Sequence, residues 1–187
     1  MDRAQILESA AQIIRQKGFH AASMQDIARA VNLQKASLYH HFSSKQEILL
    51  ELLDQALDLL SERVLRVQDL DMPVEEKLRR AMQIYLASLT EYDDLAAVLL
   101  LEHRSLNPEY HDRHIPRRDR FEKLWRDLIQ QGVQSGQFKV VDPAMTARAL
   151  LGVMNWTITW YRPGGGSSIE AISDNYASLF LDGLRKE

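Results

Sequence analysis

The chain of 187 residues contains no cysteine, so disulfide bonds, thiolate metal ligands and thiolate nucleophiles are excluded. Its longest apolar run, LAAVLLL at 95–101, is far shorter than the roughly 20 residues that a membrane-spanning helix needs. The N-terminal residues alternate charged and apolar side chains at helical spacing and lack the uninterrupted apolar core of a secretory signal. We therefore expect a cytoplasmic protein without a membrane partner.

The sequence also lacks the sustained alternation of polar and apolar residues that marks a half-buried strand. Almost every segment shows a helical period instead; one example is the stripe formed by Ile6, Ala10 and Ile14. Glycine and capped proline positions separate these segments. The pattern predicts an all-α fold of about nine helices.

Two short helices joined by a tight turn are predicted near the N-terminus. Ser23 and Asp26 form a capping box that begins a helix at about 24–31. After a turn of about three residues the helical pattern restarts at Gln34, with Leu38 and Phe42 four residues apart and facing inward. This arrangement is typical of a helix-turn-helix, whose second helix projects its outer face.

That outer face has the chemistry of a DNA contact. Lys35 can neutralise a phosphate or donate to guanine, Gln34 can pair with base edges, and Tyr39 can donate to a phosphate oxygen. The first 47 residues also hold six basic against four acidic side chains, whereas the remainder holds 17 against 22. We expect a DNA-binding domain at 1–47 and a ligand-binding and dimerisation domain at 48–187.

The stretch GFHAASMQDIARAVNLQKASLYHHFSSKQEIL, 18–49, resembles the N-terminal DNA-binding signature of the TetR family of transcriptional repressors. The resemblance implies a three-helix head, a long connecting helix, a larger helical ligand-binding domain, and a homodimer that reads a palindromic operator in double-stranded DNA. Carried over position by position, it places the DNA contacts on Gln25, Gln34, Lys35, Ala36, Ser37, Tyr39, His40, His41 and Lys45.

Three of these positions leave alternatives open. Gln34 stands where the family usually has serine or threonine. This difference either weakens the N-cap of the recognition helix or reflects a preference for a particular base. Ala36 stands where glycine is frequent. For His41, a ring wedged between helices and bonded to the backbone is weighed equally with a phosphate contact.

The last two predicted helices, about 143–161 and 168–185, differ in pattern. Apolar side chains wrap nearly around the first of them, which requires more than one neighbour, and form a single stripe on the second. We read the pair as half of a symmetric bundle completed by a second subunit. Trp156 and Trp160 therefore favour the core or the dimer interface over a ligand contact.

The segment EHRSLNPEYHDRHIPRRDR, 102–120, is rich in arginine and histidine. His111 and His114 suggest a metal site, but this spacing is common by chance and a solvated helix end is favoured. The arginines indicate either a mouth that holds an anionic head group or an exposed charged face. The candidate ligand-binding residues are Arg104, Arg117, Arg118, Phe121, Trp125, Trp156 and Trp160.

Several segments of the second domain are similar to a TetR subgroup associated with fatty-acid, steroid or aromatic catabolism and acyl-CoA ligands. This similarity gives the hypothesis of an acyl-CoA effector and no bound cofactor. One alternative is a multidrug-efflux repressor that senses cationic drugs; another is a helical carrier or enzyme that does not bind DNA. No arrangement of nucleophile, base and acid is evident, and this disfavours an enzyme.

Overall fold

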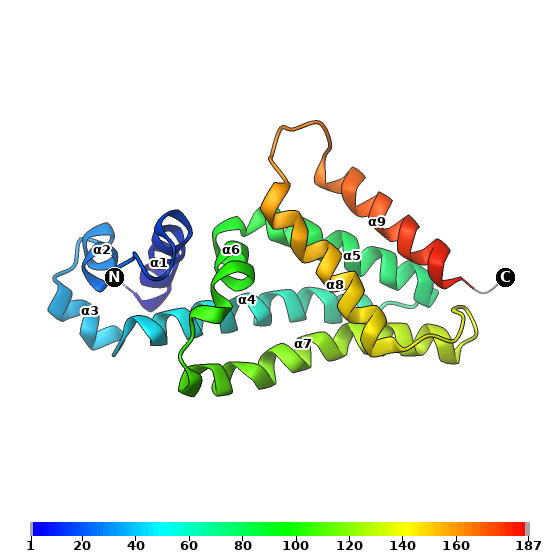
Figure 1. The fold of residues 1–187 in the computed structure, drawn as a ribbon, viewed down its shortest axis with the longest axis horizontal. Coiled ribbons are helices and arrows are strands. Elements are labelled where there is room, and N and C mark those ends of the chain that lie inside the picture. Colours follow the sequence, from blue (N-terminus) through cyan, green and yellow to red (C-terminus); the bar gives the residue numbers. More distant parts are fainter. Residues whose placement is uncertain (1, 186–187) are drawn as a thin grey trace. The chain divides into compact units, whose positions relative to one another are not determined.

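A computed structural model describes residues 2–185 of the chain (Figure 1). Nine α-helices and one short 3₁₀ helix occupy this described part. Their bounds are α1 Arg3–Lys17, α2 Met24–Ala30, α3 Lys35–His41, α4 Lys45–Gln68, α5 Val74–Glu91, α6 Asp93–Glu102, η1 His103–Ser105, α7 Pro108–Gln134, α8 Pro143–Trp160 and α9 Ile169–Leu184. The prediction of an all-α fold with about nine helices is confirmed.

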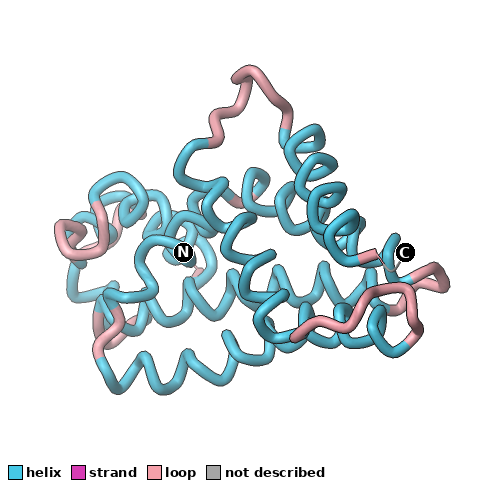
Figure 2. Tube along the Cα trace, turned by 45° about the vertical axis from the view of Figure 1, so that its right-hand side comes forward, coloured by secondary structure: helices cyan, strands magenta, loops and turns pink. Residues whose placement is uncertain are grey.

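The helix starts follow from capping residues in the sequence. Ser23 Oγ accepts the Asp26 N–H at 3.1 Å, and Asp26 accepts the Ser23 N–H at 3.0 Å, which completes the predicted capping box of α2. Asp142 accepts the N–H groups of Ala144 and Met145 and begins α8, whose first residue is a proline. Figure 2 shows that loops join the helices, including the loop between α8 and α9.

The chain divides into two compact units. One contains the described residues up to Asp58 together with Tyr92–Arg117, and the other contains Leu59–Glu91 together with the described residues from Arg118. The unit boundaries fall inside α4 and α7, so each of these helices contributes to both units. The functional boundary predicted at residues 47 and 48 remains a prediction, because compactness does not assign function.

The first unit has a core made by α1, α2, α3 and the beginning of α4. Ile6, Ile14, Ile27, Leu38 and Phe42 are all fully buried in it. Helix α6 packs against α1 in the same unit. Arg15 on α1 forms ion pairs with Asp93 at 2.5 Å and Asp94 at 2.8 Å at the beginning of α6.

The second unit has an aromatic core. The Tyr85 ring on α5 stacks on Phe121 at 5.9 Å and meets Trp125 edge-on at 5.6 Å; both partners lie on α7. The Tyr85 hydroxyl donates to Asn155 Oδ1 on α8 at 2.5 Å. Complete burial raises the pKa of Tyr85, so this hydroxyl remains a donor at every physiological pH.

The end of α7 is fixed by a close approach between Gly132 and Phe138. Phe138 is almost fully buried, and its N–H donates to the Gly132 carbonyl at 2.9 Å. A Cβ atom on Gly132 would overlap the Phe138 ring. The next residue, Lys139, donates its N–H to the Leu184 carbonyl at 2.8 Å, which ties this turn to the end of α9.

Within residues 2–185, no helix combines the length and apolar character needed to cross a bilayer.

Gly132→Ala is expected to destabilise the protein by about 1–3 kcal/mol, because the added methyl group must displace the Phe138 ring. The better helix preference of alanine offsets at most about 1 kcal/mol of this loss. The free energy of unfolding in urea measures the effect. In a Phe138→Leu background the same substitution should cost less; an equal cost in both backgrounds would contradict a steric origin.

Candidate nucleic-acid interface and effector site

Helix α3 is held in place from one side. Leu38 and Phe42 are fully buried, as the sequence predicted. The Arg3 guanidinium lies 4.0 Å from the centre of the Phe42 ring and donates to the His41 carbonyl at the end of α3. Arg3 also pairs with Glu47 and Glu51 on α4. Arg3 therefore ties the start of α1 to the end of α3, a role that sequence reasoning missed because its partners lie 38 or more positions away.

The opposite side of α3 is open. Most of the predicted contact residues on it are exposed: Gln34, Lys35, Ala36, Tyr39 and His40. The Lys35 ammonium lies 5.9 Å from the centre of the Tyr39 ring, one helical turn away. Gln34 occupies the N-cap position without a side-chain cap hydrogen bond, so its amide remains available. The structure thus brings these residues together on one accessible face.

The remaining predicted contacts on α2 and α3 are half-buried: Gln25, Ser37 and His41. The His41 backbone carbonyl accepts a hydrogen bond from the Arg3 side chain, and both alternatives for the His41 ring stay predictions. Asp26, next to Gln25, is held by hydrogen bonds from Ser23 and then from Lys17, which lower its pKa to about 2. Asp26 is therefore ionised at neutral pH, and its carboxylate holds the start of α2 in place through these hydrogen bonds.

Lys45 was expected to contact a DNA phosphate, but its side chain is engaged within the protein. Its ammonium donates to the Phe19 carbonyl at 2.7 Å, the Ala22 carbonyl at 2.6 Å and the His20 carbonyl at 3.3 Å. Desolvation lowers the pKa of Lys45, and the nearby Glu102 carboxylate opposes that shift. Because three carbonyls accept its donors, Lys45 closes the loop between α1 and α2 instead of pointing to an open surface.

Within the first unit, Glu102 on α6 bonds to the same loop, and Gln46 on α4 bonds to the residues that join α6 to α7. The Glu102 carboxylate accepts the Phe19 N–H at 3.1 Å and the Ser105 hydroxyl at 3.0 Å. The Gln46 side chain donates to the Ser105 carbonyl and accepts the Asn107 N–H, both at 2.9 Å. The loop before α2 and the start of α4 are thus bonded to residues more than 50 positions further along the chain.

The arginine and histidine segment is largely paired. His114 is buried and lies 2.9 Å from Asp54, so the interpretation of this position as a solvated helix end was wrong. Arg117 pairs with Asp54 at 3.1 Å and also with Asp58, both on α4. Arg104 is exposed. These contacts give His114 and Arg117 roles in joining α4 to α7.

The aromatic residues of the predicted ligand set separate into two groups. Phe121 and Trp125 are buried in the core of the second unit. Two buried polar atoms of this unit, Trp125 Nε1 and Thr157 Oγ1 on α8, have no hydrogen-bond partner. Trp156 and Trp160 are exposed on α8, by 66% and 44%. The first group faces the interior, whereas the second belongs to an open apolar face.

That open face extends over both final helices. The exposed large apolar residues of α8 and α9 are Met145, Val153, Trp156, Trp160 and Leu179. The two helices otherwise bury residues such as Leu150 and Leu181. Four of these five residues lie on α8 and one lies on α9, so α8 above all marks an interaction surface.

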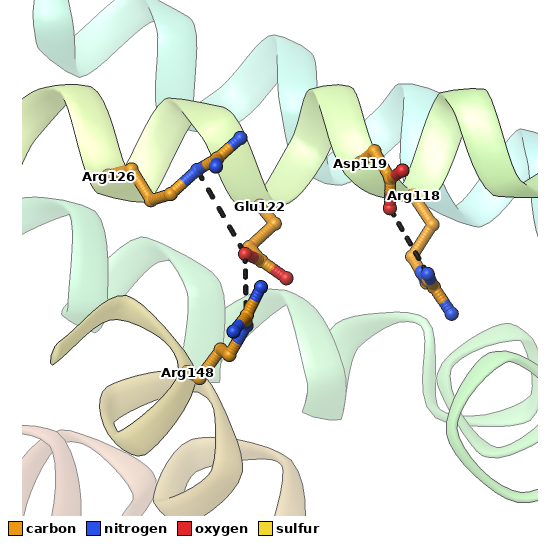
Figure 3. Close-up of a pocket in the computed structure, with 5 residues that line it drawn as sticks. All are labelled: Arg118, Asp119, Glu122, Arg126 and Arg148. Carbon is orange, nitrogen blue, oxygen red and sulfur yellow. Dashed lines mark hydrogen bonds and ion pairs between the residues drawn. The ribbon is translucent and has the colours of Figure 1, made fainter. Parts of the chain in front are cut away.

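A charged hollow of about 570 Å³ lies between α7 and α8 in the second unit (Figure 3). It is lined by Arg118, Asp119, Glu122, Arg126 and Arg148. Only Arg118 was among the predicted ligand residues. Arg126 and Arg148 were missed because 22 positions separate them in the sequence and neither lies in the arginine-rich segment.

Two family models match most of the chain. The model described as bacterial regulatory proteins, tetR family, matches residues 6–52, and the tetracyclin repressor-like C-terminal domain matches residues 71–184. The transcriptional repressor KstR2 of Mycobacterium tuberculosis is 31% identical over 193 aligned residues, covering 99% of this chain and 94% of the relative.

Solved structures are similar over nearly the whole chain. The regulator PfmR from Thermus thermophilus is 38% identical with a TM-score of 0.88, covering 97% of this chain and all of that one. AibR in complex with isovaleryl coenzyme A and operator DNA is 32% identical with a TM-score of 0.88, covering 95% of this chain and 96% of that one.

The two lysines should separate in experiment. Lys45→Met is expected to lower the free energy of unfolding by about 1–3 kcal/mol, because it leaves carbonyls of the loop without their donor. Lys35→Met should leave stability unchanged and instead weaken DNA binding and reduce its salt dependence by about one phosphate contact. Thermal unfolding and fluorescence anisotropy at several salt concentrations test both. Equal stability of the two variants would contradict the placement of Lys45.

Proposed function

The chain belongs to the TetR family of bacterial regulatory proteins, and from this premise we propose that it is a dimeric repressor released from its operator by an anionic acyl thioester. The observation that carries the DNA-binding part is the construction of α3. Two buried anchors, Leu38 and Phe42, hold a short helix whose other face is polar and exposed.

The exposed residues of α3 suit two kinds of DNA contact. Gln34 and Lys35 lie at its beginning, where the side chains of a recognition helix reach base edges in the major groove. Ser37 and Tyr39 can donate to phosphate oxygens and fix the register of the helix. In a dimer, two copies of α3 would read half-sites roughly 34 Å apart, which is one turn of DNA.

The open apolar face of α8 and α9 supports the proposed dimer. Two copies of these helices, packed against each other, would form a four-helix bundle and remove the exposed tryptophans from water. A twofold axis requires a surface that can pack against its own copy, and the exposed apolar residues of α8, with Leu179 of α9, are suited to this. The proposal keeps the predicted division into a DNA-binding head at residues 1–47 and an effector and dimer domain at residues 48–187.

Trp156→Glu and Leu179→Glu are expected to produce monomers, because each places a carboxylate in the apolar face. The monomers should lose about 10²-fold or more in apparent operator affinity, since the two half-sites no longer bind as one unit. Light scattering and gel shifts with DNA from upstream of the gene measure both effects. Val140→Glu, at an apolar position that is 92% exposed outside these helices, is the matched control. Dimers that persist in both α8 and α9 variants would refute the interface.

The second unit supports an effector with an apolar part and an anionic part. Its interior is aromatic and contains unpaired polar atoms at Trp125 and Thr157, which a bound molecule could satisfy. Its charged hollow is lined by three arginines against two carboxylates, so it favours an anion over a cationic drug. A solved relative, AibR, has been captured with isovaleryl coenzyme A, which combines both parts. We therefore favour an acyl-CoA thioester as the effector class.

A saturating acyl-CoA is expected to lower operator affinity roughly 5- to 150-fold, the range that corresponds to a coupling of about 1–3 kcal/mol between two sites. Calorimetric titration with acyl-CoAs of increasing chain length, free fatty acids and cationic drugs identifies the ligand class. Gel shifts with the same compounds measure release. Binding confined to the cations would refute the effector class and leave the DNA-binding proposal intact.

A further inference from the structure

The charged hollow between α7 and α8 contains a carboxylate shared by two guanidinium groups. Glu122 and Arg126 lie one turn apart on α7, and Arg148 reaches them from α8 (Figure 3). Glu122 Oε1 is 3.3 Å from Arg148 Nε and 3.9 Å from Arg126 Nε. One carboxylate oxygen therefore lies between two cations and is closer to only one of them.

This sharing leaves Arg126 incompletely satisfied. Its Nε atom is buried and has no hydrogen-bond partner, and the 3.9 Å separation from Glu122 is too long for a hydrogen bond. In the same unit, Arg185 approaches Glu75 much more closely, to 2.5 Å. The rest of the Arg126 side chain is partly open, with an exposed fraction of 37%, so its guanidinium can be reached by an acceptor from outside the chain.

We propose that this hollow binds a phosphate group, and that Glu122 occupies its place in the ligand-free protein. A phosphate presents several oxygens and can accept from Arg126 and Arg148 at once, whereas Glu122 offers them a single shared oxygen. Arg118 adds a third guanidinium at the rim, beside Asp119 at 3.1 Å. The volume of about 570 Å³ admits more than a lone phosphate and suits a nucleotide-sized group.

Helix α7 connects this site to the aromatic interior. Phe121 and Trp125 form one stripe on α7, and Glu122 and Arg126 form a second stripe displaced by one residue. Consecutive residues of a helix are rotated by about 100°, so one stripe faces the core while the other faces the hollow. A molecule with an apolar chain and a phosphate can contact both stripes. The binding of an acyl-CoA across both stripes rests on the proposed function. The binding of a phosphate group in the hollow does not.

The test uses full-length protein and three probes: octanoyl-CoA, adenosine 3′,5′-bisphosphate, and the octanoyl thioester of N-acetylcysteamine, which lacks phosphate. Arg126→Gln and Arg148→Gln should each weaken the first two probes at least ~10-fold by calorimetry, the loss typical of a charge-assisted contact, and leave the third unchanged. Glu122→Gln should tighten the two phosphate-bearing probes several-fold, because it removes a competing negative charge. A purely structural role of Glu122 predicts no such gain. Arg80→Gln on the exposed side of α5 is the matched control.

The outcomes separate the two proposals. If both arginine variants bind octanoyl-CoA as the wild type does, the phosphate site is refuted while the effector class stands. If the bisphosphate binds and depends on the arginines but octanoyl-CoA leaves operator binding unchanged, the site stands and the effector class falls. If inorganic phosphate competes as well as the bisphosphate, the site takes free phosphate and not a nucleotide. Failure of every phosphate-bearing probe to bind the wild type refutes the site outright.

Discussion

DNA recognition by this protein depends on the burial of Leu38 and Phe42, because these two side chains hold α3 in place. A helix of seven residues is too short to be stable alone in water, so α3 exists only because these two side chains enter the core of the first unit. Arg3 on α1 donates to the carbonyl at the end of α3 and pairs with Glu51 on α4, which fixes this end of α3. The exposed polar face of α3 is consequently presented in one orientation, as recognition of a rigid duplex requires.

The features that depend on local sequence were predictable. Helical period, capping boxes and turn length determine α2, α3 and their inward anchors, because each involves residues within about four positions of one another. The exposure of Lys35 and Tyr39 follows from the same spacing. Trp156 and Trp160 were assigned to the core or an interface; their exposure shows that the core alternative was wrong, and the interface alternative stays a prediction.

The features that depend on contacts between distant segments could not be predicted from the sequence. Lys45 was expected to face phosphate because it stands in the first turn of α4, but the fold brings the Phe19 and Ala22 carbonyls to its ammonium. His114 was judged by its charged neighbours, whereas its burial is decided by Asp54 on another helix. Arg126 and Arg148 likewise form a site only when α7 and α8 lie together. Residue spacing along one helix does not determine which side chains of other helices lie nearby, so these pairs could be identified only from the structure.

The packing of α1 against α6 affects how this protein could be recombined with its relatives. The compact unit that holds the recognition helix includes Tyr92–Arg117 as well as residues 2–58. Glu102 and Gln46 form hydrogen bonds between these two segments. A chimera that exchanged only the N-terminal segment would separate α1 from the α6 surface against which it packs. Sensory and reading functions in this chain are therefore not freely interchangeable modules, and a graft that preserves folding must carry α6 and the start of α7 with it.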